Sequence, residues 1–230
     1  MENKEWVNFW VEYGKQAQSK DPQTQVLRTI NKLPIEKEKW EFCLEYIEGQ
    51  LEVNASDDIL DLCCGNGLIS QRLSPKCNSV VAVDVSEDLL HGIDVKKYPN
   101  IKPICSDIRK LDFKEGAFSK IIIYAAIQYL SLKETVLLFE NVKKWLRPGG
   151  IFFIGDIPDH SKRWTFFNSK EREAVYFNTV KEEADIVGTW FDSEWLKKLA
   201  DYSGFKQAEL IEQHPDMIYY FFRFDMKITN

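Results

Sequence analysis

A glycine-rich turn follows a short apolar run in the first third of the chain. The run from Ile59 to Leu62 predicts a short buried strand. The sequence Cys63-Cys64-Gly65-Asn66-Gly67 comes next, and its glycines permit positive φ and let a ligand approach the backbone. A helix that begins near Leu68 would point its unpaired N–H groups at that ligand. The turn therefore predicts a ligand-binding site.

Two aspartates belong to the same predicted site. Asp61 lies near the carboxyl end of the first strand, where ligands bind in open α/β sheets, and its carboxylate suits a ligand with a positive charge. Asp84 ends a second apolar strand, which runs from Ser79, about 20 residues beyond the turn. An acid in that place accepts hydrogen bonds from ribose hydroxyls. Its alternative role is the N-cap of a helix that starts near Ser86. With the glycine turn upstream, we favour ribose binding.

Composition limits the classes of function. The chain has 230 residues, which predicts one domain, or one domain with an added cover. Its hydrophobic content of 44% and charged content of 29% are typical of a soluble globular protein. The net charge is -6 and Lys and Arg form no cluster, which argues against a nucleic-acid partner.

The cysteines and the apolar runs indicate a cellular location. Five cysteines, an odd number, and no recognisable signal peptide predict a cytoplasmic protein with reduced thiols. No apolar run reaches the roughly 20 residues of a membrane span, so no membrane association is expected. The cysteines have no metal-ligand spacing, and we expect no metal.

The spacing Asp61-x-x-x-Gly65-x-Gly67 resembles motif I of the class I S-adenosylmethionine-dependent methyltransferases. The usual form of that motif is Asp/Glu-x-Gly-x-Gly-x-Gly, and Cys63 stands where its first glycine usually occurs. The resemblance implies an α/β, Rossmann-like methyltransferase fold. It has a mostly parallel seven-stranded sheet, a C-terminal antiparallel hairpin and helices on both faces. The cofactor that it implies is S-adenosyl-L-methionine.

Three later landmarks extend the resemblance. Asp107 and Ile108 resemble the positions that meet the adenine amino group and a ring nitrogen, although Asp107 could instead be a simple turn aspartate. Tyr124 ends a fourth apolar strand and runs into Ala125-Ala-Ile-Gln-Tyr-Leu130, as in many small-molecule methyltransferases. The Pro148-Gly149-Gly150 turn resembles the approach to the fifth strand. The cofactor-binding residues that the resemblance implies are Asp61, Cys63, Gly65, Gly67, Asp84, Val85, Asp107, Ile108 and Tyr124.

The N-terminal segment contributes a further candidate. Arg28 lies in a polar stretch that could meet a ligand carboxylate, or that could simply be solvated. In the same segment Trp6, Phe9, Trp10 and Tyr13 recur every three to four residues, which predicts an aromatic stripe on one helical face. This helix either docks on the main domain or closes over the ligands as a lid. We therefore divide the chain into an arm or lid, 1–35, and a methyltransferase domain, 36–230, with a substrate cover at 157–190.

Patterns elsewhere predict the remaining elements. Residues 36–51 predict an amphipathic helix, 132–146 a second, and 192–205 a third that ends at a glycine. Residues 206–212 and 217–228 predict a closing antiparallel hairpin. The cover at 157–190 has no clear periodicity.

Methyl transfer requires a base only if the acceptor must lose a proton. His160, which follows the fifth strand, is the leading candidate, and its alternative role is that of a solvated loop histidine. Asp156, Tyr129 and Tyr13 are further catalytic candidates. The acceptor is expected to be a small polar molecule, sugar-like in one version, and methylated at oxygen or nitrogen. Neither an (Asn/Asp)-Pro-Pro-(Tyr/Phe) turn nor a Pro-Cys pair occurs, which argues against a nucleic-acid acceptor.

Two other functions fit parts of the sequence. The spacing Gly65-x-Gly67-x-x-Ser70 nearly fits a dinucleotide fingerprint and would suit an NAD(P)-dependent oxidoreductase. Against it, Asp61 would repel a pyrophosphate, and no catalytic domain follows the fifth strand. A non-catalytic binding protein of the same fold would have little need of all three aspartates, 61, 84 and 107. The sequence does not distinguish a monomer from a homodimer.

Overall fold

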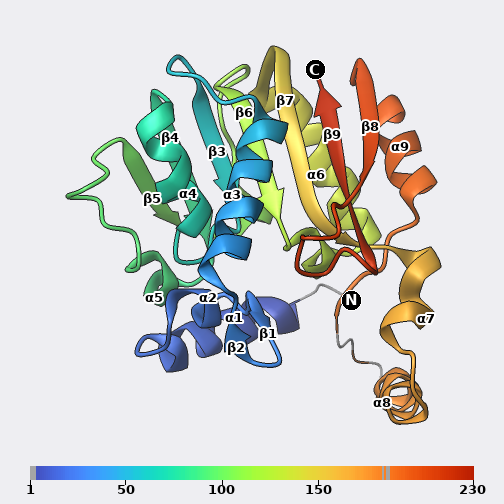
Figure 1. Ribbon diagram of the computed structural model, residues 1–230. Coiled ribbons are helices and arrows are strands. Elements are labelled where there is room, and N and C mark those ends of the chain that lie inside the picture. The colour runs from blue at the N-terminus through green and yellow to red at the C-terminus, as the bar shows by residue number, and fades with distance from the viewer. Residues whose placement is uncertain (1–3, 183, 185–186) are drawn as a thin grey trace.

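The computed structural model describes residues 4–182, 184 and 187–230 (Figure 1). Within this part of the chain, seven strands form one sheet in the order β5-β4-β3-β6-β7-β9-β8. Their bounds are β3 Asp58–Leu62, β4 Ser79–Asp84, β5 Ile101–Cys105, β6 Phe118–Tyr124, β7 Leu146–Pro158, β8 Gln207–Glu212 and β9 Arg223–Thr229. Strands β3 to β7 pair in parallel, and β9 runs antiparallel to both β7 and β8. The expected mostly parallel sheet with a C-terminal antiparallel hairpin is confirmed.

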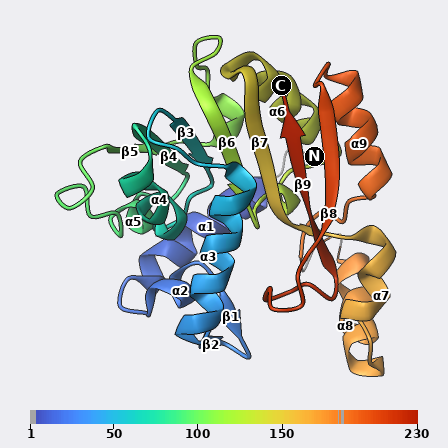
Figure 2. The same cartoon turned by 45° about the horizontal axis from the view of Figure 1, so that its top comes forward.

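The central strands are continuous apolar runs because helices cover both faces of the sheet. Along β6, Ile121, Ile122 and Ile123 are all fully buried, and they alternate between two separate core clusters. Residues Ile121 and Ile123 pack with α6 (Leu132–Trp145) and α9 (Ser193–Tyr202). Ile122 packs with α3 (Lys37–Leu51) and α4 (Leu68–Leu73) on the other face. Figures 1 and 2 show these helix pairs on opposite sides of the sheet.

The three predicted long helices are present, and the closing hairpin differs from its prediction. The second hairpin strand begins at Arg223 instead of residue 217. Its partner β7 ends at the Pro158–Arg223 pair, so residues before 223 have no strand to pair with. They form turns in which Met217, Ile218 and Phe222 are buried.

An N-terminal arm lies below the carboxyl ends of the parallel strands (Figures 1 and 2). It consists of α1 (Lys4–Ala17), α2 (Pro22–Gln25) and a hairpin of β1 (Thr29–Ile30) and β2 (Leu33–Pro34). The Gln18 side chain donates to Asp88 Oδ1 at 2.8 Å, which ties the arm to α5 (Glu87–Leu90). Residues 1–3 of the expected arm lie outside the described residues.

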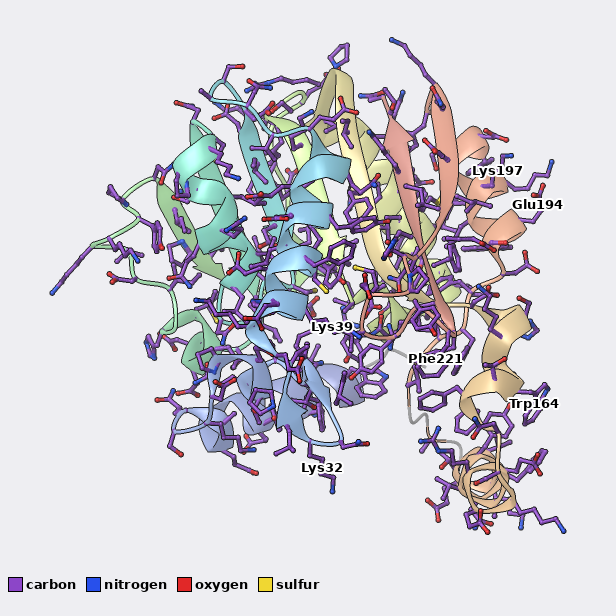
Figure 3. All side chains as sticks on the ribbon, viewed as in Figure 1. Lys32, Lys39, Trp164, Glu194, Lys197 and Phe221 are labelled. Atoms are coloured by element: carbon purple, nitrogen blue, oxygen red, sulfur yellow. The ribbon has the colours of Figure 1, made fainter. Side chains whose placement is uncertain are left out.

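The segment after β7 contains two helices, α7 (Arg163–Phe166) and α8 (Lys170–Lys181). The sequence predicted an aperiodic cover, and α8 has no buried residue. Good helix formers such as Lys, Glu, Arg and Ala, together with the Ser169 N-cap, favour this helix without an apolar stripe. Figure 3 shows Trp164 on the outer side of the molecule, where its side chain is 52% exposed. Residues 183, 185 and 186 of the expected cover lie outside the described residues.

Among the described residues, every helix is too short or too polar to cross a membrane.

Candidate cofactor and acceptor site

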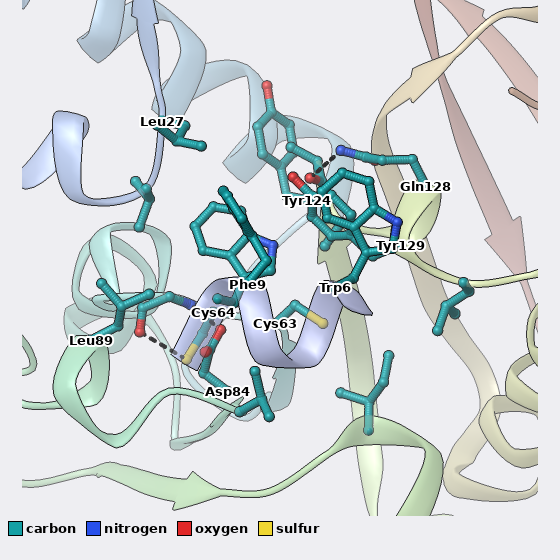
Figure 4. Close-up of a pocket in the computed structure, with 18 of the residues that line it drawn as sticks. Trp6, Phe9, Leu27, Cys63, Cys64, Asp84, Leu89, Tyr124, Gln128 and Tyr129 are labelled. Carbon is teal, nitrogen blue, oxygen red and sulfur yellow. Dashed lines mark hydrogen bonds between the residues drawn. The ribbon is translucent and has the colours of Figure 1, made fainter. Parts of the chain in front are cut away.

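A cavity of about 1150 Å³ lies at the carboxyl ends of the parallel strands. The ends of β3, β4 and β6, the loop after β5, the N-terminal arm and the turns before β9 all contribute to its wall. In Figure 4 the rings of Trp6, Tyr124 and Tyr129 lie around this space, with Cys63 and Asp84 below them. Most of the residues that the sequence singled out therefore lie around one space.

Asp61 is buried at the end of β3, where it contributes to the wall of the cavity. Ser70, in the first turns of α4, donates its hydroxyl to Asp61 Oδ2 at 2.6 Å. Burial raises the pKa of Asp61 to about 7, and the hydrogen bond from Ser70 offsets only part of that effect. A cationic ligand group beside Asp61 would favour its ionised form.

Cys63 holds the left-handed backbone conformation that its family position usually gives to glycine. Its φ is +59°. A residue with a Cβ loses roughly 1–2 kcal/mol in this conformation. The turn thus keeps the geometry of the glycine form, with Cys64 N–H donating to the Val83 carbonyl at 2.9 Å. Backbone strain of this kind is typical of ligand sites.

Gly65 leaves room for the N-terminal arm. A Cβ on Gly65 would lie 2.6 Å from Val26 Cγ1, and the φ of Gly65 is +57°. Next to it the Asn66 amide donates to the Pro22 carbonyl at 2.8 Å and to Gln25 Oε1 at 2.7 Å. The sequence predicted that this glycine admits a ligand, whereas here it also admits α2 and the residue after it. The arm and the glycine turn form one packed unit.

Asp84 both lines the cavity and fixes the turn. Its two carboxylate oxygens accept the N–H groups of Gly65 at 2.8 Å and Ser86 at 2.9 Å. Burial raises its pKa, and these backbone hydrogen bonds oppose the rise. A carboxylate has about four acceptor positions, so two remain for ligand hydroxyls. Val85 follows it in the cavity wall.

Asp107 is fixed by an arginine. The Arg109 side chain donates to both carboxylate oxygens of Asp107, at 2.6 to 3.0 Å, and to Glu134 Oε1 at 2.6 Å. Burial alone would raise the pKa of Asp107, but the contacts with Arg109 lower it. Asp107 therefore stays ionised and can accept a hydrogen bond from a ligand amino group, beside buried Ile108.

Residues beyond β6 form the opposite wall. Ala125 has a φ of +55°, and Gln128 donates its amide to the Ala125 carbonyl at 2.7 Å. Tyr129 packs against Trp6 and Trp10, with ring centroids 4.7 and 5.6 Å apart. Burial raises the pKa of Tyr129.

Sequence reasoning singled out Arg28 but missed Arg223, which it meets at Asp156. Arg28 Nη1 lies 2.5 Å and Arg223 Nη1 lies 3.5 Å from Asp156 Oδ2. Both guanidinium groups stack over the Tyr219 ring, at 5.9 and 5.5 Å from its centroid. The sequence offered Asp156 only as a further candidate base, without a partner. The signal for Arg223 was a charge that directly follows the apolar and aromatic run 217–222.

The structure does not bring every catalytic candidate to the cavity. His160 is exposed, its backbone N–H donates to the Phe191 carbonyl, and it is absent from the cavity wall. Tyr13 donates its hydroxyl to the Thr24 carbonyl at 2.7 Å and also lies outside the wall. Gly67 lies just outside it as well, at the N-cap of α4. Of the four catalytic candidates, Tyr129 alone is part of the cavity wall formed by the described residues, because Asp156 also lies outside it.

Comparisons with known proteins agree with this geometry. Residues 59–150 match the family model described as methyltransferase domain. The chain is 26% identical over 176 residues to the malonyl-[acyl-carrier protein] O-methyltransferase of a Marinomonas species, a match that covers 65% of this chain and 63% of that protein. The chain therefore spans less than two thirds of the length of this relative.

Solved structures share the fold. One is phosphoethanolamine N-methyltransferase 1 of Haemonchus contortus in complex with phosphoethanolamine and S-adenosylhomocysteine. It has a TM-score of 0.73 and 16% identity, over 99% of this chain and 48% of that one. The N-methyltransferase NodS of Bradyrhizobium japonicum, in complex with S-adenosyl-L-homocysteine, has a TM-score of 0.64 and 14% identity, over 96% and 98% of the two chains.

The motif, the strand order and the domain match are consistent with one another, and none of these comparisons points to an oxidoreductase. Together they support a class I S-adenosylmethionine-dependent methyltransferase, with residues 59–150 as the matched methyltransferase domain.

Proposed function

We propose that the protein binds S-adenosylmethionine at the glycine-turn end of the cavity and transfers its methyl group to a nitrogen or oxygen of a small polar acceptor. The observation that carries this proposal is the continuity of the cavity, whose wall includes Asp61 and Asp84 together with Tyr129 and Arg223. Its volume of about 1150 Å³ exceeds the roughly 300–1000 Å³ of ordinary ligand pockets, which leaves room for two molecules.

The proposed cofactor contacts follow from the charges on the wall. Asp61 would meet the cationic amino group, and Asp84 with Val85 would meet the ribose. Asp107 and Ile108 would meet the adenine, and Tyr124 would close the cavity beyond β6. Arg28, partly buried beside Asp156, would bind the carboxylate by charge-assisted hydrogen bonds.

The chemistry requires mainly positioning. When bound, the cofactor supplies an activated methyl group that passes to an acceptor lone pair, while the bonding pair of the carbon–sulfur bond stays on sulfur. The protein must hold the acceptor in line at attack distance, which contributes up to roughly 7–11 kcal/mol in favourable cases. The rings of Trp6 and Trp10 and the side chain of Gln128 line the acceptor half and would restrict its orientation.

Tyr129 suits the role of a hydrogen-bond donor better than that of a base. Burial raises its pKa, so its hydroxyl stays protonated at neutral pH. It would orient the acceptor atom, and an amine acceptor could arrive already deprotonated from solvent. We also propose that the N-terminal arm acts as a lid, because Trp6, Trp10 and Arg28 line the cavity from that arm.

One solved neighbour supports the proposed acceptor class. The Haemonchus protein holds phosphoethanolamine, a small polar amine, which supports an acceptor of that size. A sugar-like acceptor is the alternative, suited to the aromatic wall.

Transfer can be tested with S-adenosylmethionine labelled in its methyl group and a panel of small amines, amino alcohols and sugars. We expect labelled product with at least one class and formation of S-adenosylhomocysteine in equal amount. The matched control is the Asp84→Asn variant, which should bind and turn over the cofactor poorly. Failure of the wild-type protein to bind the cofactor would contradict the proposal.

A further inference from the structure

Two aspartates and two arginines line different parts of the cavity wall. Asp61 and Asp84 lie at the ends of the neighbouring strands β3 and β4, beside the glycine turn. Arg28 and Arg223 meet where the N-terminal arm packs against the turns before β9. The acidic half suits the cationic groups of the cofactor, whereas the other half presents two guanidinium groups.

Arg223 is buried but its hydrogen bonds within the protein are incomplete. It is 7% exposed and contributes to the cavity wall. Its Nη1 donates to the Asp156 carbonyl oxygen, and Nε is without a hydrogen-bond partner in the described part of the chain. A guanidinium can bind two oxygens of one anion through a pair of its N–H groups.

The two arginines share one carboxylate instead of pairing with one each. Asp156 shares one oxygen between the two arginines. The oxygens of Asp225 instead accept from the Asp156 N–H at 2.6 Å, from Gln213 at 2.7 Å and from the Tyr46 hydroxyl at 2.8 Å. Asp225 thus orients Asp156, and Asp156 in turn orients the arginines.

The backbone at Asp156 departs from regular strand geometry. Its φ is +63°, and the register of β7 with β9 shifts between Ile154 and Ile157. This irregularity brings the Asp156 carboxylate within reach of Arg28, 128 positions earlier in the chain. Local strain at a ligand site is retained when the surrounding structure fixes it.

Strand order assigns the two arginines to different ligands. From the glycine turn the sheet continues β3-β6-β7-β9. Arg28 stacks on Tyr124, the last residue of β6, at 5.2 Å, whereas Arg223 begins β9, two strands farther on. A cofactor bound at the turn reaches Arg28 first, and a second ligand beyond it reaches Arg223.

We propose that the methyl acceptor carries an anionic group, a phosphate or a carboxylate, which binds to Arg223 on the Tyr219 side of the cavity. Tyr219 supports this subsite because its hydroxyl donates to the Thr29 carbonyl at 2.8 Å while its ring lies under both guanidinium groups. The inference rests on the proposed function and adds the acceptor's charge to it.

Calorimetric titration of the protein saturated with S-adenosylhomocysteine tests this subsite. The probes are phosphoethanolamine, β-alanine and ethanolamine, which share an amine and carry a phosphate, a carboxylate or no anion. We expect at least one anionic probe to bind roughly 10–100-fold more tightly than ethanolamine, as for hydrogen bonds to charged groups. The tighter of the two identifies the anion.

Variants separate this inference from the proposed function. Arg223→Gln should lower the affinity for the preferred anionic probe by roughly 10–100-fold and leave the affinity for S-adenosylhomocysteine unchanged. Arg223→Lys keeps the charge but loses the paired N–H groups, so it should also weaken binding of the probe. It serves as the test if the Gln variant fails to fold. The matched control is Arg147→Gln, since Arg147 pairs with Asp58 away from the cavity wall.

Two results would overturn the anion subsite alone. One is wild-type protein that binds S-adenosylhomocysteine but binds neither anionic probe more tightly than ethanolamine. The other is an unchanged probe affinity in folded Arg223→Gln or Arg223→Lys. Absence of S-adenosylhomocysteine binding to wild-type protein would instead overturn the proposed function, and with it this inference.

Discussion

Asp61 is kept buried although burial raises its pKa to about 7. The ordinary value is 3.8, so between these two values the folded protein holds a proton that the unfolded chain releases. Stability therefore falls as pH rises through this window, and the full penalty is present above pH 7. Such an arrangement favours function over stability, because a cationic ligand can recover the loss.

Asp61→Asn should stabilise the ligand-free protein and abolish most cofactor binding. Removing the buried charge should raise the free energy of unfolding by roughly 4 kcal/mol at pH 8 and by only about 2 kcal/mol at pH 5, at about 1.4 kcal/mol per pKa unit. Denaturant unfolding at the two pH values measures this difference. A variant less stable than wild type at pH 8 would contradict it.

Asp84→Asn should weaken both the turn and the cofactor site. Asn offers one acceptor oxygen where Asp84 now accepts from Gly65 and Ser86, so roughly 1–3 kcal/mol of stability should be lost. Affinity for S-adenosylhomocysteine should fall roughly 10–100-fold through lost ribose contacts. Asp201→Asn, an exposed change on α9, is the control. Wild-type affinity in Asp84→Asn would remove the ribose assignment.

At this scale the sequence identified many of the residues that line the cavity. Asp61, Gly65 and Asp84 could be found because they directly follow apolar runs and their spacing is local. Arg223 and Asp156 could not, because their contact depends on a register shift in β7 and on a strand paired across the sheet. His160 was selected for its chemistry and its place after β7, but neither determines where a side chain points.

At the scale of elements, the N-terminal arm is the part most directly coupled to the ligands. Val26 packs on Gly65 and the Gln25 side chain binds Asn66, so α2 and the glycine turn depend on each other. The aromatic stripe of α1 could be predicted from its periodicity. The packing of α2 against the turn could not, since four residues carry no periodic signal.

Tyr13→Phe tests this coupling. The change removes the hydrogen bond from α1 to the Thr24 carbonyl, worth about 1 kcal/mol, and should open the arm roughly fivefold more often. Limited proteolysis should cleave the arm correspondingly faster, and S-adenosylhomocysteine should protect it. The control is Tyr202→Phe, whose side chain is 76% exposed. Equal cleavage rates in Tyr13→Phe and wild type would contradict the coupling.

At the scale of the whole molecule, fold and charge place two ligands in one cavity. The parallel strands bring three aspartates to one edge of the sheet, and the antiparallel hairpin and the arm bring the arginines. The sheet could be predicted because continuous apolar runs alternate with helical patterns. The arginine end could not, because it joins residues from both ends of the chain.

Calorimetric titration with S-adenosylmethionine, S-adenosylhomocysteine and, separately, NADH tests the central claim most directly. The claim predicts saturable binding of the first two and none of NADH, because Asp61 would repel a pyrophosphate. Binding of NADH alone, or of none of the three, would contradict it.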